Sequence, residues 1–318
     1  MRTSCKFIAL VLVALVHVGS VLAQDFPTKP IRFIVPGVGG GGDFVARLVG
    51  NGLSGRVGQA VVIENRPVGI IPGDAVAKAA PDGYTLLVSG SSLWLAAFMQ
   101  DDVPFDVLRD FAPVTLLVTS PNVLVVTPKL EAKSVKELIA LAKAKPGALN
   151  YASNSTGSSP HLAAELFKSM AGADIVRINY KNNVQSIADL MSGQVQMMFS
   201  TAGAAAPLVK AGKLRALAVT SAKPTELVPD LPTVAATLPG YETESVFGLL
   251  APARTPAPII SRINREVVLV LKTPDVKEKF ITSGVEPVGT TPEEFLVRIK
   301  GDMNRLGKVI KDANIRAE

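Results

Sequence analysis

The chain has 318 residues, of which 48% are hydrophobic and 19% charged, so it can bury a large core and its length is typical of two domains. The formal net charge is +6, basic residues are scattered, and aromatic residues make up 5%, so we expect no nucleic-acid partner. Cys5 is the only cysteine, and His17 and His161 are the only histidines. Thiolate and three-histidine metal sites are therefore excluded, and we expect no cofactor.

Residues 1–23 predict a secretory signal. Arg2 and Lys6 form a positive start, residues 7–22 are almost continuously apolar, and small residues end at Ala23, ahead of a cleavage point. Cys5 precedes the apolar stretch, so it is not placed to carry a lipid anchor. We expect an exported, periplasmic and monomeric mature chain without a thiol and with a net charge of about +4, since Arg2 and Lys6 leave with the signal. A retained membrane anchor is the alternative.

Short runs rich in Val, Ile and Leu alternate with helical patterns along the rest of the chain, which predicts an α/β fold with mostly parallel sheets. No flexible linker is visible, so we expect two domains joined by crossing strands around a cleft that closes by hinge bending. Strands are predicted at residues 31–35, 61–63, 85–88, 114–118, 123–126, 175–178, 195–199 and 214–219. Helices are predicted at residues 43–57, 134–144, 161–170, 184–192, 259–271, 274–283 and 292–313.

A glycine-rich loop stands between the first predicted strand and the first predicted helix. Glycine permits positive φ and close approach to the main chain, and the first amides of a helix attract anions. We therefore expect an anion at Val38, Gly39, Gly40, Gly41, Gly42 and Asp43. Two alternatives stay open, which are a turn without a ligand and a dinucleotide site of the G-x-G-x-x-G type with Glu64 as its acid. A Walker A loop is excluded, because Asp43 stands where that motif needs lysine.

A second loop, residues 151–160, crowds hydroxyl groups before the helix that begins near His161. The donors that we expect to reach an anion there are Ser153, Ser155, Thr156, Gly157 and Ser158. A solvated connector is the alternative interpretation. We expect His161 to be structural, in the first turn of its helix and hydrogen-bonded to a neighbouring loop. Hydrolysis is disfavoured, because the chain lacks a G-x-S-x-G nucleophile elbow around its serines.

Several ordered motifs together resemble the extracytoplasmic receptors of tripartite tricarboxylate transporters, the Bug-type solute-binding family. They lie at residues 26–36, 64–67, 79–86, 150–153, 193–199 and 212–219, with Gly157 and His161. The resemblance covers essentially the whole mature chain and displaces the dinucleotide interpretation. It implies a periplasmic binding protein of type II-like fold, with lobe 1 formed by residues 24–123 and 247–318 and lobe 2 by residues 124–246. It also implies a protein that is not an enzyme, takes a small organic acid as its ligand and has membrane permease subunits as its partners.

The departures from this family pattern fall in the loops that we expect to hold the ligand. Gly39 replaces a proline, Gly42 a hydroxyl residue and Ser200 an aspartate, and residues 68–73 form a shorter, more apolar loop. The ligand's identity is therefore not implied by the resemblance. The apolar loop favours a ligand with one carboxylate and an apolar body over a tricarboxylate, provided that Val68, Ile70 and Ile71 do not pack inward.

Beyond the two loops, we place Gly69, Ser91 and Ser92 on the first wall of the cleft and Tyr180, Ser200 and Thr201 on the second. Trp94 follows Ser91 and Ser92 and is expected either to pack beneath that loop or to contact the ligand. Two other functions stay open at this point. One is an exported enzyme acting on a small organic acid, and the other is a ligand sensor that feeds a membrane signalling protein.

Overall fold

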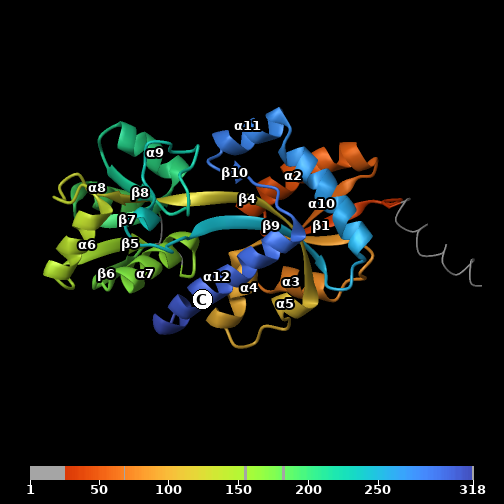
Figure 1. The fold of residues 1–318 in the computed structure, drawn as a ribbon, viewed down its shortest axis with the longest axis horizontal. Coiled ribbons are helices and arrows are strands. Elements are labelled where there is room, and N and C mark those ends of the chain that lie inside the picture. Colours follow the sequence, from red (N-terminus) through yellow and green to blue (C-terminus); the bar gives the residue numbers. More distant parts are fainter. Residues whose placement is uncertain (1–25, 68, 154–155, 181–182, 317–318) are drawn as a thin grey trace, which may run out of the picture.

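The computed structural model describes residues 26–67, 69–153, 156–180 and 183–316, so the predicted signal lies outside the described residues. Among the described helices, none has both the length and the hydropathy needed to cross a membrane. The elements fall into two groups joined by two long strands (Figure 1). The joining strands are β4 (Phe111–Val126) and β9 (Glu244–Pro252).

We call the two groups the first and second lobes. The first lobe contains β1 (Ile31–Pro36), α2 (Gly41–Val57), β2 (Val61–Arg66), α3 (Ile71–Ala77), β3 (Thr85–Gly90), α4 (Ser91–Met99), α5 (Val107–Asp110), α10 (Ala257–Leu271), α11 (Pro274–Thr282), β10 (Glu286–Pro287) and α12 (Pro292–Asp312). The second contains α6 (Val135–Ala144), β5 (Leu149–Ser153), α7 (Ser159–Ala171), β6 (Ile175–Asn179), α8 (Asn183–Ser192), β7 (Met197–Thr201), α9 (Ala202–Lys210), β8 (Arg215–Val219) and a 3₁₀ turn (Val234–Ala236).

The strands follow the order β2-β1-β3-β9-β4-β7-β5-β6, with β8 and β10 also paired to β4. Pairing is parallel between β1 and its neighbours β2 and β3, and between β5 and its neighbours β6 and β7. The joining strands β4 and β9 pair antiparallel with each other and with their other partners. The predicted parallel arrangement therefore describes β1, β2 and β3 in the first lobe and β5, β6 and β7 in the second, whereas β8, β10 and the joining strands make the whole sheet mixed.

The two strands predicted at residues 114–118 and 123–126 are one continuous strand, β4. Its residues from Phe111 to Pro121 pair with β9, and those from Asn122 to Val126 pair with β7 and β8. Pro121 favours a turn when the sequence is considered alone, because proline has no N–H to donate to a neighbouring strand. It is tolerated within β4 because the strand changes partners at this position. The sequence patterns also missed β5, β9, β10 and helices α3, α4, α5 and α9. Most of these elements are short, and α4 is almost entirely apolar.

The first lobe has apolar packing on both faces of its sheet. Phe33 and Val35 face a core shared with α2 and α10, whereas Ile34 faces a core shared with α4 and α12. Trp94 is buried in the second of these cores, edge-on to Phe295 at 5.9 Å between ring centroids. Trp94 therefore packs beneath the surface, as the first of its two predicted roles requires.

A buried cluster of charges attaches the C-terminal helix α12 to β9. Arg298 lies 2.9 Å from Glu242, 3.1 Å from Glu244 and 3.1 Å from Asp302, and Arg305 lies 3.0 Å from Asp302. The Trp94 indole N–H also donates to Asp302, at 3.3 Å. Burial raises the pKa of Asp302, and the neighbouring arginines act in the opposite direction. The cluster is thus satisfied only while its cations and anions stay together.

Replacing the central cation tests this interpretation. Arg298→Met leaves Glu244 and Asp302 buried without their main counter-charge, so we expect the free energy of unfolding to fall by about 3–5 kcal/mol. Urea denaturation measures this change. The control is Lys308→Met, which removes an exposed partner of Asp312 and is expected to cost less than about 1 kcal/mol. Equal effects of the two substitutions would contradict the assignment.

Candidate functional site

The first glycine loop is held in shape by side chains from two elements. Gly37 and Gly39 have φ values of 71° and 72°, which glycine adopts without strain. Asn65, on β2, donates to the Gly37 carbonyl at 2.5 Å and to Asp43 Oδ1 at 2.8 Å. Val38 is 78% exposed, and its neighbours Gly39 to Gly41 are exposed as well. The loop therefore offers an open main chain at the start of α2, where the first helical amides lack intrahelical acceptors.

Asp43 stabilises this loop from beneath. Its Oδ2 accepts from the Gly39 N–H at 2.9 Å and from Arg47 Nε at 3.1 Å, and the side chain is buried. Hydrogen bonds from Arg47 and Asn65 lower the pKa of Asp43 to about 2. The carboxylate is therefore ionised and already occupied, and only the backbone of Asp43 remains to meet an anion.

Phe247 on β9 contacts both the start of α2 and the end of β3, which are parts of the first wall. A Cβ placed on Gly42 would lie 3.0 Å from the Phe247 ring, and one placed on Gly90 would lie 2.6 Å from the Val246 carbonyl. Small residues at both positions let the start of α2 and the end of β3 approach β9. Ser91 and Ser92 follow Gly90 at the start of α4, half-buried and exposed respectively.

The loop after β2 divides its apolar residues between core and solvent. Gly69 is exposed with a φ of 110°, Ile70 packs against the core, and Ile71 is 50% exposed. Val68 lies outside the described residues. The inward-packing alternative therefore holds for Ile70, whereas Ile71 keeps an apolar surface on the outside.

The second wall is built where β5 passes into α7. Ser153 is buried at the end of β5, and its Oγ accepts from Arg177 Nε at 3.2 Å. Arg177 Nη2 donates to Thr156 Oγ1, also at 3.2 Å. Gly157 and Ser158 are the last two residues before α7, and both are half-buried. Ser158 is the N-cap of this helix. Ser155 lies outside the described residues.

His161 stands in the first turn of α7 and closes this loop. Its Nδ1 accepts from the Gly157 N–H at 3.0 Å, and only 2% of the residue is exposed. The predicted hydrogen bond from His161 to a neighbouring loop is confirmed. Burial, followed by the positive charge of Arg177, lowers the pKa of His161 to about 4.

The remaining predicted residues of the second wall differ in accessibility. Tyr180 is buried, donates its hydroxyl to Asp189 at 2.8 Å, and donates its backbone N–H to the Ser153 carbonyl at 2.8 Å. Burial and Asp189 raise the pKa of Tyr180 to about 12. Ser200 is buried and Thr201 is exposed. Tyr180 therefore supports the loop through its backbone and keeps its hydroxyl occupied.

Sequence patterns missed three residues that shape the site. Asn122 lies opposite Thr201 in the β4–β7 pair, is buried, and donates to Ser159 Oγ at 2.8 Å. Phe247 supports the first wall, and Arg177 braces the second. Only Arg177 left a recognisable signal, because it is a cation inside a short apolar strand.

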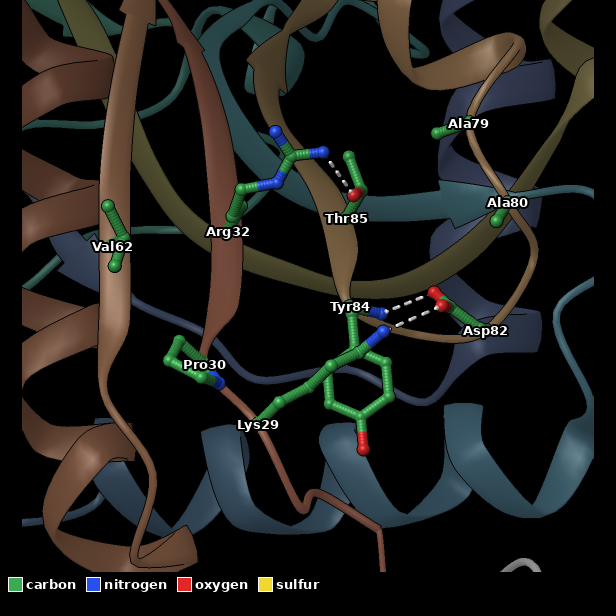
Figure 2. Close-up of a pocket in the computed structure, with 9 residues that line it drawn as sticks. All are labelled: Lys29, Pro30, Arg32, Val62, Ala79, Ala80, Asp82, Tyr84 and Thr85. Carbon is green, nitrogen blue, oxygen red and sulfur yellow. Dashed lines mark hydrogen bonds and ion pairs between the residues drawn. The ribbon is translucent and has the colours of Figure 1, made fainter.

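Another hollow, of about 420 Å³, lies at the opposite end of the first-lobe strands (Figure 2). It opens where β1, β2 and β3 begin, whereas the predicted loops follow the ends of those strands. Its cations are already paired, Lys29 with Asp82 at 3.5 Å and Arg32 with Glu64 at 3.3 Å. Charge balance thus makes it a weaker anion site than the loops. In the described part of the chain, no group of three or more His, Cys, Asp and Glu residues is placed to hold a metal ion.

The protonation of His161 can be measured specifically, because the only other histidine, His17, lies in the predicted signal. We expect its imidazole to stay neutral, with the proton on Nε2, until the pH falls to about 4. The lowered pKa stabilises the fold above the ordinary value near 6.5, and this contribution is lost as the pH falls toward 4. Nuclear magnetic resonance of the ring nitrogens tests the prediction. Titration near the ordinary value would contradict it.

Comparisons with known proteins agree with this architecture. The family model described as tripartite tricarboxylate transporter family receptor, TctC, matches residues 45–315. Protein BugT of Bordetella pertussis is 37% identical over 93% of this chain and 93% of its own length. The structure described as R. palustris Rpa4515 with adipate is 36% identical, covers 92% of this chain and all of its own, and has a TM-score of 0.71.

The structure of MatC (Rpa3494) from Rhodopseudomonas palustris with bound malate is 27% identical, with a TM-score of 0.68, and covers 90% of this chain and all of its own. These structures confirm the two-lobed α/β fold of a periplasmic solute-binding protein. The family resemblance seen in the sequence motifs is confirmed as well, since the matched residues span most of the chain. The chain belongs to the TctC family, the solute-binding receptors of tripartite tricarboxylate transporters.

Proposed function

We propose that this receptor binds a small organic carboxylate in a cleft between its lobes and delivers it to the permease subunits of a tripartite tricarboxylate-type transporter. The proposal also places this receptor in the periplasm, as a monomer. The observation that carries the proposal is a pair of loops, one in each lobe, each running into a helix N-terminus. Relatives described with adipate and malate support the carboxylate class.

In this proposal the two walls have different chemistry. The first wall supplies backbone amides at Val38 to Asp43, together with Gly69, Ser91 and Ser92. The second supplies Ser153, Ser155 to Ser158, Ser200 and Thr201, with Tyr180 holding its loop. Backbone and hydroxyl donors neutralise a carboxylate without a bound metal, directly or through bridging water.

We place the lobe boundaries at residues 24–123 with 247–318, and 124–246, as the family resemblance implies. The change of β4 partners at Asn122 supports a boundary near residue 123. The start of β9 at Glu244 supports the return crossing near residue 246. Hinge bending at these crossings would bring the two walls onto the ligand.

Carboxylate binding is tested by calorimetry on the processed protein, which is the chain without the predicted signal at residues 1–23. The probes are adipate, malate, citrate and glucose. We expect at least one acid to bind with a micromolar or lower Kd, which corresponds to a binding free energy of about 8 kcal/mol or more in magnitude. We expect glucose not to bind. The bound acid should also raise the melting temperature by mass action. Glucose binding without acid binding would overturn the proposal. Chemical conversion of the bound acid, followed by magnetic resonance, would instead indicate an exported enzyme.

Ile71 provides a test of selectivity within this proposal. It is half-exposed beside Gly69, so its side chain is available to cover an apolar ligand body. We expect Ile71→Ala to weaken adipate binding about threefold and citrate binding less, because a few methylene contacts are lost. The control is Ile70→Ala, which we expect to lower the free energy of unfolding while leaving the adipate-to-citrate ratio unchanged. An unchanged ratio in Ile71→Ala would rule out contact by this residue.

A further inference from the structure

Arg177 is a cation whose partners among the described residues are all neutral. It lies on β6, beside Tyr151 in the parallel pair with β5. Its three hydrogen bonds go to Ser153 Oγ at 3.2 Å, Thr156 Oγ1 at 3.2 Å and Asn179 Oδ1 at 3.3 Å. These bonds use Nε and Nη2, so the two Nη1 hydrogens have no acceptor within the described residues. The guanidinium therefore keeps donors to spare.

Other arginines of the protein are compensated differently. Arg298 is surrounded by carboxylates, and Arg215 donates to the carbonyl oxygens of Leu130 and Ala132 at 2.8 and 3.2 Å. Within the described residues, no carboxylate lies within 4.0 Å of Arg177. The acid on the adjacent helix, Glu165, is instead paired with Lys168 at 2.9 Å.

The surroundings of Arg177 add to its positive charge. The N-terminus of α7 lies at the same loop, and helix dipoles place partial positive charge there. The charge of Arg177 also disfavours protonation of His161. A half-buried guanidinium beside a helix N-terminus, with no counter-ion among the described residues, is the electrostatic complement of a carboxylate.

We propose that Arg177 supplies the positive charge that binds the ligand carboxylate at the second wall, and thereby sets the preference for an acid over its neutral analogue. The inference rests on the proposed function, because it assigns a role within the same cleft. Nη1 is the group that would meet the carboxylate, while Nε and Nη2 hold Ser153 and Thr156. Lysine carries the same charge but cannot make all of these contacts at once.

Calorimetry with adipate and its neutral diamide, adipamide, tests this role on the processed protein. We expect Arg177→Gln to weaken adipate binding at least about tenfold and adipamide binding less than about threefold, since one charge-assisted interaction is removed. Arg177→Lys should bind adipate more tightly than Arg177→Gln. The matched control is Arg215→Gln, which removes an equal charge from the same lobe, away from the loops, and should bind adipate normally. The His161 resonance checks that the loop keeps its structure.

The outcomes separate this inference from the proposed function. If the wild type binds none of the carboxylate probes, the proposed function fails and the role of Arg177 fails with it. If the wild type binds adipate and Arg177→Gln binds it equally well, only the role of Arg177 is overturned. Equal weakening of adipate and adipamide would show a bracing residue and would also overturn the inference. The same holds if the lysine and glutamine variants bind adipate equally.

Discussion

The continuous backbone pairing of β4 is the constraint on which the rest of the structure depends. Each strand must satisfy its backbone donors and acceptors, and β4 does so with β9 along its first part and with β7 and β8 along its last. The change occurs around Pro121 and Asn122, so one strand takes part in the sheets of both lobes. The glycine loop packs on Phe247, which pairs with Val118 of β4. Asn122 of β4 donates to Ser159 after the serine loop, so both loops are positioned from the middle of this strand.

The two walls use their charged side chains in different ways. In the first wall, Asp43 is negative, but Arg47 and Asn65 occupy it completely, so its charge serves the loop. In the second wall, Arg177 is positive and its partners are neutral. The first wall therefore offers dipoles and the second offers a net charge. Such an asymmetric pair suits a ligand with one anionic end and a less polar remainder.

Sequence patterns were sufficient for the elements that have clear periodicity and punctuation. The helices predicted at residues 43–57 and 161–170 correspond closely to α2 and α7. Sequence patterns failed where tertiary pairing decides the structure. Pro121, for example, favours the end of a strand when the sequence is considered alone, but it lies within β4 in the structure. Helix α4 was missed because its residues are almost all apolar and buried, which leaves no polar face to reveal a period.

Sequence patterns likewise predicted some parts of the candidate site and missed others. Glycine and serine loops are visible in a linear sequence because their residues are contiguous. Arg177 is different, since it reaches Ser153 and Thr156 only through the register of β5 and β6. A strand pairing of this kind depends on the whole fold, so the contact could not be derived from spacing alone.

The neutral, enclosed state of His161 has a consequence for the conditions under which the protein can work. Outside the predicted signal the chain has no thiol, and His161 is its one histidine, with a pKa near the acid end of the range. Mild acidity therefore does not charge His161 at the serine loop. A receptor exported from the cell, as proposed, would keep His161 neutral while the pH of its surroundings varies above about 4.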